Sequence, residues 1–330
     1  MIPSQYGKLV QDDNPGSENQ LFVIGETHPR PLRGLAGPIS EEQQLAIHKI
    51  YQLLIQEQDI DILPVGGRNP KKDLAAVQKA RTHQDVAHID LGEMTDKELL
   101  LVLVSRAQQL SIYRICESLI QQQDIRLLLV EGGDFSEDLS NAVQEARNHP
   151  DAARIDLSRI TDDELLSILI GGPSYFQDIP VVTANRLLLL RYPGLAIRSV
   201  DNAGLRDIQD SLYEEIFAVV KNKSYDGRRY VAARDYAWFF VRLRSIEFLK
   251  NSYTAMQQES QGKAILIVGE EHSKDLRRWR DLPIHYSLEE KYQDREFEQR
   301  FGITPDHLVM NLEGDFLKHR RTYIRPKGTA

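Results

Sequence analysis

The sequence predicts an α/β protein with a central, mostly parallel β-sheet that is covered by helices on both faces. Three observations lead to this prediction. Short apolar segments alternate along the chain with longer segments whose apolar residues recur at helical spacing. Several of the short segments run directly into glycine, as expected of strands buried inside a parallel sheet. A tandem duplication repeats the same helix-strand-helix unit.

The composition excludes several classes of protein. The 330 residues are 41% hydrophobic and 27% charged, as in an ordinary folded protein. A formal charge of −8 gives no electrostatic reason to bind nucleic acid or anionic lipid. There is no run of about 18 apolar residues, and residues 1–20 lack the regions of a signal peptide. The single cysteine, Cys116, cannot form an intrachain disulfide, which fits a reducing compartment. We therefore expect a cytoplasmic protein, and the charge and hydropathy lead us to expect no membrane or nucleic-acid partner.

One domain is expected to hold most of the chain. No Pro- or Gly-rich linker of convincing length divides the sequence, so residues 21–320 are predicted to form a single α/β domain. Residues 1–20 are expected to be an N-terminal extension, and residues 321–330 a C-terminal tail. Outside the duplicated stretch, the predicted strands are residues 21–24, 195–200, 264–268 and 307–312, and the longest predicted helix is residues 228–258.

The duplication comprises two units, residues 41–104 and 106–170. Their matching blocks are identical at 13 of 23 and at 16 of 27 positions, which indicates a tandem copy rather than a shared helix-friendly composition. Two copies are too few for a solenoid, so we interpret them as one duplicated αβ unit inside a larger sheet. The matching blocks are residues 43–65 with 108–130, and residues 77–103 with 143–169.

Each copy is predicted to contain a helix, a strand, a second helix, a loop and a third helix. The strands are expected at residues 60–65 and 125–130, where short apolar runs occur. Cys116 lies on the apolar stripe of the first helix of the second copy, so we interpret it as a core residue rather than a nucleophile. Thr95 and Thr161 each precede a glutamate by three residues, which is the capping-box pattern that opens a helix.

Two apolar strands run into the same tetrapeptide pattern, Gly-Glu-x-His. One motif extends from Gly25 to His28 and the other from Gly269 to His272. A glycine at this point lets the backbone turn sharply or approach a ligand closely. Since ligands of parallel sheets bind beyond the carboxyl ends of the strands, both histidines are expected at one edge of the sheet. The alternative interpretation is two capped turns that carry surface histidines.

Further polar residues follow other predicted strands. Glu131 ends the strand of the second copy, and a carboxylate at a buried strand end needs a partner or a function. Glu131 is therefore a candidate third member of the site. Asp201 and Asn202 follow another strand, where they are expected either to orient a histidine or a ligand, or to cap a helix.

The long predicted helix contributes an arginine to the candidate site. Tyr230, Val231, Trp238 and Val241 form an apolar stripe that also includes Arg234. An arginine on a buried stripe requires an acidic partner or binds an anion. Arg234 is therefore a candidate, with a plain Arg–Glu bridge as the alternative.

Together these motifs resemble the superfamily that joins the Tiki and TraB proteins, the erythromycin-esterase-like enzymes and the ChaN-like haem-binding proteins. Members share two Gly-x-x-His motifs, an intervening glutamate after a strand, and an arginine on a later helix. The extra αβ copy, residues 37–106, departs from that pattern, so the resemblance does not predict how substrate reaches the site. The matching residues, in the same order over residues 20–315, are Gly25 with His28, Glu131, Arg234, and Gly269 with His272.

The resemblance implies an αβ core with helical insertions and three different activities. Tiki-like members are metal-dependent proteases, the esterase-like branch uses histidine as a general base, and the ChaN-like branch binds haem. Two imidazoles and a carboxylate can hold a divalent metal, whose bound water is then an effective nucleophile. We therefore predict a hydrolase that cleaves an amide or ester in a small-molecule or peptide substrate, with a divalent metal bound by His28, His272 and Glu131.

The remaining site residues have supporting roles in this prediction. Glu26 and Glu270 are expected to tune or assist the histidines, and Arg234 to stabilise developing negative charge. A metal-free version, in which a glutamate orients one histidine as the base, stays open. So does a different class of function, a protein that binds haem or another small molecule through His28 and His272 without turnover.

Overall fold

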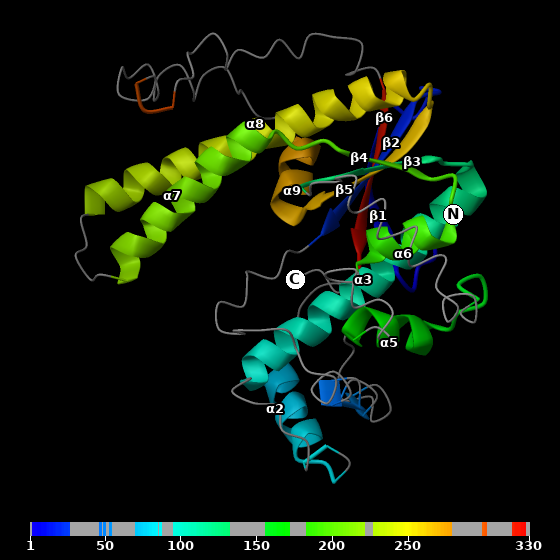
Figure 1. Cartoon of the computed structure of the whole chain (residues 1–330), viewed down its shortest axis with the longest axis vertical. Coiled ribbons are helices and arrows are strands. Elements are labelled where there is room, and N and C mark those ends of the chain that lie inside the picture. The colour runs from blue at the N-terminus through cyan, green and yellow to red at the C-terminus, as the bar shows by residue number, and fades with distance from the viewer. Residues whose placement is uncertain are drawn as a thin grey trace.

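The described chain is built on a six-stranded sheet with the strand order β1-β6-β2-β5-β3-β4 (Figure 1). The strands are β1 (Gly7–Asp13), β2 (Gln20–Glu26), β3 (Leu127–Val130), β4 (Ala196–Ser199), β5 (Lys263–Gly269) and β6 (Arg320–Pro326). The computed structural model describes residues 2–26, 46–47, 49–50, 53–54, 70–84, 86–87, 95–132, 156–171, 183–221, 227–278, 299–301 and 319–327.

The sheet is mostly parallel, as predicted. β2 pairs in parallel with β5 and β6, and β3 pairs in parallel with β4 and β5. Only β1 runs antiparallel to its neighbour, β6. The central strands β2, β3 and β5 are buried along almost their whole length, which explains their continuous apolar sequences.

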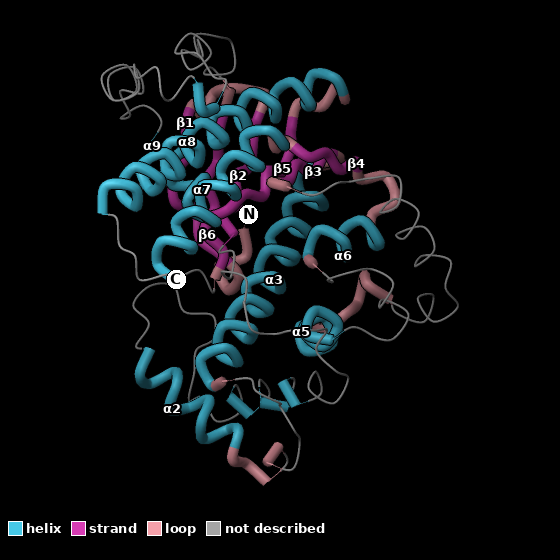
Figure 2. The backbone as a smooth tube through the Cα atoms, turned by 60° about the vertical axis from the view of Figure 1, so that its left-hand side comes forward, coloured by secondary structure: helices cyan, strands magenta, loops and turns pink. Residues whose placement is uncertain are grey.

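Helices cover both faces of this sheet, which confirms the predicted fold class (Figure 2). Alternate residues of each strand point to opposite faces. In β2, Phe22 and Ile24 join the core formed with α2, α3, α5 and α6, whereas Leu21 and Val23 join the core formed with α8 and α9. The helices are α2 (Pro70–Arg81), α3 (Asp96–Gln123), α5 (Asp162–Gly171), α6 (Ala184–Arg191), α7 (Ala203–Lys221), α8 (Gly227–Gln258) and α9 (Glu270–Arg278).

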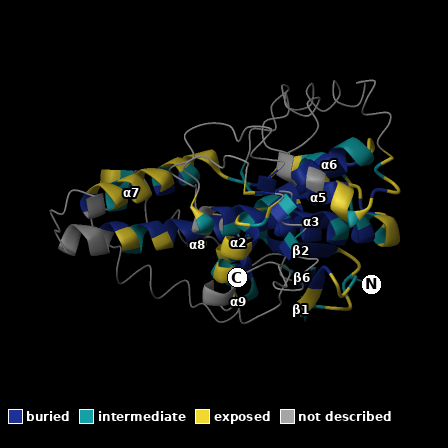
Figure 3. Ribbon diagram, turned by 90° about the horizontal axis from the view of Figure 1, so that it is seen from below, coloured by how far each residue is buried: buried dark blue, intermediate teal, exposed yellow. Residues whose placement is uncertain are grey.

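Helix α8 connects two packing environments. Its first half packs against α7 through a separate apolar cluster that includes Leu212 and Phe240, and this helix pair extends beyond the sheet (Figure 1). Its second half packs on the sheet through Phe248, Leu249 and Met256. The middle of α8 therefore lies where the helix pair meets the sheet. Burial follows this division, since α7 is largely exposed while the central strands and α3 are largely buried (Figure 3).

The second duplicated unit is described more completely than the first. Its predicted strand is β3, and the capping box forms at Thr161, whose hydroxyl and Glu164 hydrogen-bond reciprocally at 2.8–3.3 Å. The third helix of the first copy and the first helix of the second are one continuous helix, α3, of 28 residues. The predicted strands at residues 60–65 and 307–312 lie outside the described residues.

The two ends of the chain belong to the sheet. The prediction that residues 1–20 and 321–330 form an extension and a tail is wrong, because β1 and β6 pair with each other and β6 also pairs with β2. Their charged residues concealed these strands, since charge is rare in a buried strand. Across the ladder, Arg320 donates to both carboxylate oxygens of Asp12, at 2.9 and 2.6 Å. Of the helices that the structure describes, none has the length and apolar character needed to cross a membrane.

Candidate functional site

Four parallel strands direct acidic residues to one edge of the sheet. Glu26 ends β2, Glu131 follows β3, Asp201 follows β4, and Glu270 follows β5. The strand ends are level, because the backbone of Glu26 lies opposite Gly269 and the Glu131 N–H donates to the carbonyl of the β5 residue Ile267 at 3.0 Å. The carboxyl edge is the place where parallel sheets bind ligands.

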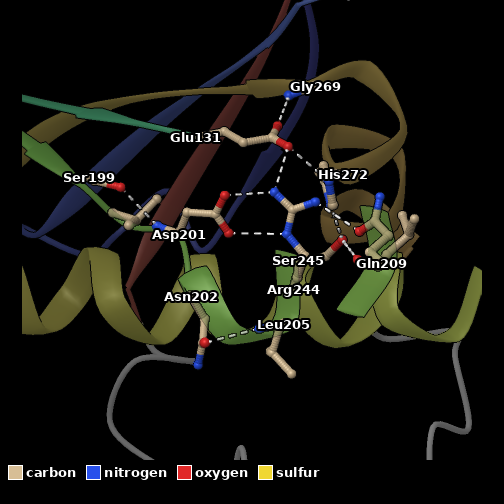
Figure 4. Close-up of polar contacts among 12 residues, drawn as sticks. Glu131, Ser199, Asp201, Asn202, Leu205, Gln209, Arg244, Ser245, Gly269 and His272 are labelled. Atoms are coloured by element: carbon tan, nitrogen blue, oxygen red, sulfur yellow. Dashed lines mark hydrogen bonds and ion pairs between the residues drawn. The ribbon is translucent and has the colours of Figure 1, made fainter. Parts of the chain in front are cut away.

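Glu131 and His272, which are 141 positions apart in the sequence, are in contact at this edge (Figure 4). Oε1 of Glu131 lies 3.2 Å from Nε2 of His272, and Oε2 accepts a hydrogen bond from the N–H of Gly269 at 2.5 Å. That N–H precedes the first turn of α9, where the helix dipole also favours a carboxylate. The His272 side chain is only 7% exposed and that of Glu131 is 12% exposed.

Arg244, from the middle of α8, joins three parts of this edge. Its Nε and Nη2 donate to the two oxygens of Asp201 at 3.0 and 2.7 Å, Nη2 also donates to Glu131 at 3.1 Å, and Nη1 donates to Gln209 of α7 at 2.8 Å. The Arg244 guanidinium also lies over the ring of Phe248. Arg244 is buried, and the two carboxylates offset the cost of removing its charge from water.

Ser245 supports the other side of the His272 ring. Its Oγ is 2.8 Å from Nδ1 of His272 and 3.2 Å from Oδ2 of Asp275. Burial raises the pKa of Asp275, while the Ser245 hydrogen bond and the charges of His272 and Arg242 lower it in part. Because Ser245 is fully buried, substrate cannot reach its hydroxyl, and this serine is not a nucleophile despite lying beside a histidine.

The glycine of the first motif permits a close helix approach. A Cβ at Gly25 would lie 3.0 Å from Cβ of Ser273, on the first turns of α9. At this glycine the backbone therefore lies close to α9. His28, the histidine of the same motif, lies outside the described residues, as do the residues that follow Glu26 up to position 45.

The two motif glutamates have partners of their own. Glu26 accepts a hydrogen bond from Nε2 of Gln109 in α3, and Oε1 of Gln109 accepts one from the N–H of Ala184 at 2.9 Å. Glu270 accepts a hydrogen bond from Arg325 of β6 at 2.8 Å, with Lys274 at 3.4 Å. These contacts tie α3, α6 and β6 to the edge and give both glutamates a structural role.

The prediction that Arg234 lies on a buried stripe is wrong. Its side chain is 49% exposed and pairs with the adjacent Asp235, and Trp238 on the same side of α8 is 47% exposed. The buried stripe instead follows the small residues Ala233 and Ala237, which an apolar pattern based on large side chains overlooks. Continuing that stripe by helical spacing leads to Arg244, which is the arginine that reaches the site.

Of the two alternatives for the pair after β4, the helix cap is realised, while Asp201 pairs with an arginine rather than with a histidine. Asn202 caps α7, because its Oδ1 accepts a hydrogen bond from the N–H of Leu205 at 3.2 Å. Asp201 instead binds Arg244.

No family model, curated protein or solved structure matches this chain. The resemblance to the Tiki, TraB and erythromycin-esterase-like proteins stays a prediction from the motifs.

The described residues fit a metal centre poorly. Among them there is no group of three or more His, Cys, Asp or Glu residues suited to hold a metal, and the third predicted ligand, His28, is not described. Glu131 Oε1 and His272 Nε2 are close enough to share one ion, but Arg244 Nη2 lies 3.1 Å from the same oxygen. Its positive charge disfavours a cation there. Haem ligation would likewise displace a partner, since both ring nitrogens of His272 have one.

Proposed function

We propose that this chain is a hydrolase that cleaves an ester or amide bond by acid–base chemistry at the Glu131–His272 pair. The observation that supports it is the position of the Glu131 carboxylate. It lies at the carboxyl edge of a parallel sheet, accepts hydrogen bonds from Gly269 and Arg244, and contacts His272. A carboxylate and an imidazole at hydrogen-bonding distance can exchange a proton with a bound water, which is the requirement for general acid–base catalysis.

Each residue of the pair has a distinct role in this mechanism. Glu131 is the more exposed of the two, so it takes the proton from the attacking water. Glu131 then gives this proton to the leaving group, while His272 carries a proton on the ring nitrogen that faces Glu131 and stays hydrogen-bonded to the carboxylate. Arg244 and the Gly269 N–H hold the carboxylate in place, so that it keeps the geometry for proton transfer from one catalytic cycle to the next.

The substrate is a small molecule or a peptide that meets the pair from the side of Glu131. Arg244 and Asp201 are 5% and 3% exposed, so the network is closed on the side of α8. We also infer a reducing, cytoplasmic location from Cys116, whose thiol is free and buried.

The test measures hydrolysis of p-nitrophenyl acetate, as the ester probe, and of fluorescently labelled casein, as the amide probe. We expect wild-type protein to hydrolyse at least one probe, and Glu131→Gln and His272→Gln to lower kcat by about 100-fold or more. Glu271→Gln is the matched control, because Glu271 neighbours His272 but is 55% exposed and pairs with Lys274. It should keep the wild-type rate. Equal rates in wild type and His272→Gln would refute the proposal.

Two additional measurements separate this proposal from its alternatives. A rate that is unchanged by EDTA supports metal-free chemistry, whereas a rate that is lost with EDTA and restored by a divalent metal supports the metal-assisted version. A Soret band on haem titration that disappears in His272→Gln, without any hydrolysis, would support a haem-binding protein instead.

A further inference from the structure

Arg206 lies at the carboxyl edge of the sheet, beside the end of β3. It is in the first turn of α7, and its backbone N–H donates to the carbonyl of the cap residue Asn202 at 3.0 Å. Its guanidinium reaches Gly132, the residue that follows Glu131, because Nη1 lies 3.9 Å from the position that a Cβ on Gly132 would take. Arg206 is partly buried in this place. An arginine side chain therefore lies one residue away from the proposed base.

The Arg206 side chain is not part of the ion pairs at this edge. Two other arginines that reach it, Arg244 and Arg325, each pair with carboxylates. Among the residues that the structure describes, no carboxylate forms an ion pair with Arg206. Asp210 follows it by four positions on α7, a spacing that allows ion pairs on a helix surface, but the arginine extends toward the sheet instead. Its charge is therefore available to a ligand.

Gly132 leaves room beside this guanidinium. Its φ of 69° lies in the left-handed region, where a residue with a side chain is strained. Of the atoms that the structure describes outside the adjoining chain, only Nη1 of Arg206 lies within 4 Å of the Cβ position. The guanidinium therefore faces open space at the edge where parallel sheets bind their ligands.

The packing of α7 explains why Arg206 points to the site. Gln209 follows it by three positions, so both side chains lie on one side of the helix. Gln209 is buried, and its oxygen accepts a hydrogen bond from Arg244 at 2.8 Å. This contact fixes the rotation of α7 against the middle of α8. The same rotation directs Arg206 toward the end of β3.

We propose that Arg206 determines specificity by binding a carboxylate of the substrate, so that the ester or amide that is cleaved belongs to an acidic molecule. This inference rests on the proposed function, since it places that carboxylate beside the base, Glu131. Arginine pairs with a carboxylate through two parallel hydrogen bonds. One arginine balances one negative charge, and Glu131 and Asp201 lie nearby, so a dianionic phosphate fits less well. Neighbouring Cα atoms are about 3.8 Å apart, so a small molecule can span Glu131 and Gly132.

The test compares two p-nitrophenyl esters whose acyl chains have equal length. The monoester of adipic acid ends in a carboxylate, and the hexanoate ends in a methyl group. With spontaneous hydrolysis subtracted, we expect the wild type to hydrolyse the adipate monoester with a kcat/KM that is about 10- to 100-fold higher. Arg206→Gln should lose this preference and hydrolyse the hexanoate as the wild type does. Equal preference in wild type and Arg206→Gln would overturn the proposal.

Two further variants show that the carboxylate itself is recognised. Arg126→Gln is the matched control, because Arg126 directly precedes β3, at the opposite end of the same strand, where it is 65% exposed and pairs with Asp124. It should keep the preference, and an equal loss there would overturn the proposal in favour of an effect of total charge. Arg206→Lys keeps the charge and should retain part of the preference.

Binding without turnover distinguishes this inference from the proposed function. Calorimetric titration with monomethyl adipate, which has the same carboxylate but a poor leaving group, should show binding to the wild type that Arg206→Gln weakens about tenfold or more. Dimethyl adipate, the neutral control, should not distinguish the two proteins. If neither p-nitrophenyl ester is hydrolysed, the proposed function fails, and the titration still decides whether Arg206 binds a carboxylate. Equal affinity of wild type and Arg206→Gln for monomethyl adipate would overturn that assignment.

The source of the carboxylate is tested with a peptide. Acetyl-alanyl-alanine has a free carboxyl end, and its C-terminal amide does not. Cleavage of the free acid alone, lost in Arg206→Gln, would identify a peptide C-terminus as the group that Arg206 binds. Cleavage of neither peptide, together with the preference for the adipate monoester, would identify a small acid.

Discussion

Asp201 and Arg244 form a two-point ion pair inside the protein, with Nε and Nη2 of the arginine donating to the two carboxylate oxygens at 3.0 and 2.7 Å. The side chains are 3% and 5% exposed. Asp201 follows the edge strand β4 and Arg244 comes from α8, so this pair fixes the helix against the end of the sheet. Glu131 depends on the same guanidinium.

Removing that guanidinium is expected to destabilise the fold strongly. Arg244→Met leaves Asp201 and Glu131 as buried carboxylates without their main cation, which costs about 3–5 kcal/mol of unfolding free energy. Urea denaturation measures the loss. Arg234→Met is the control on the same helix, and because Arg234 is half exposed its effect should stay within about 0.5 kcal/mol. Similar urea midpoints for the two variants would contradict the assignment of Arg244 to the site.

The sequence predicted the inner strands well and the outer ones poorly, for a physical reason. β2 and β5 are buried on both faces, so their residues form continuous apolar runs that end in recognisable motifs. β1 has exposed residues, and β6 carries Arg320 and Arg321, whose charges are neutralised by Asp12 and Asp13 of the partner strand. That compensation is a tertiary contact, which no local pattern contains.

The same distinction applies to the candidate site. Glu131 and His272 were predicted because they follow strands, and strand ends of a parallel sheet meet in space whatever the rest of the chain does. Arg244 and Ser245 come from the middle of a helix, and their place depends on how that helix is rotated about its axis. The rotation of the helix follows from the helical spacing of three buried residues, Ala233, Ala237 and Arg244. Because alanines are small, they give a weak apolar signal in the sequence.

A methyl group at Gly25 is expected to disturb the packing of α9. In Gly25→Ala, the new Cβ would lie 3.0 Å from Cβ and 3.1 Å from Oγ of Ser273, so the helix has to shift. Overpacking of this kind costs about 1–3 kcal/mol, and the shift also moves His272 on the same helix. Thermal unfolding measures the cost. Gly16→Ala is the matched control, because a Cβ there has no neighbour within 4 Å. Equal melting temperatures for the two variants would argue against the close contact.

The ion pair between Asp12 of β1 and Arg320 of β6 is expected to make the stability of the fold depend on pH. The pKa of Asp12 is lowered, chiefly by the hydrogen bond from Arg320; burial, the next-largest effect, raises it, and the hydrogen bond from Thr322 lowers it further. A carboxyl whose pKa is lower in the folded state contributes stability above its ordinary value, and this is lost as the pH falls through the folded value. Asp12→Asn removes the effect. The difference in melting temperature between wild type and variant should be largest near neutral pH and shrink in acid, and a constant difference across the series would contradict it.

Glu131→Gln, the variant that tests catalysis, is also expected to change stability. The carboxylate of Glu131 accepts hydrogen bonds from the Gly269 N–H and the Arg244 guanidinium, and it also faces Nε2 of His272. A glutamine has one oxygen and one NH₂ group, so if its oxygen faces Gly269, its NH₂ group faces Arg244 and His272. Donors that face donors leave buried groups unsatisfied, at a cost of about 1–3 kcal/mol.

The urea midpoint of Glu131→Gln therefore has to be measured together with its rate. If it remains folded at the assay temperature and still loses activity, the loss reports on proton transfer. If Glu131→Gln had wild-type stability, the Gly269 and Arg244 donors would not depend on the carboxylate. The hydrogen-bond geometry described around Glu131 would then be wrong.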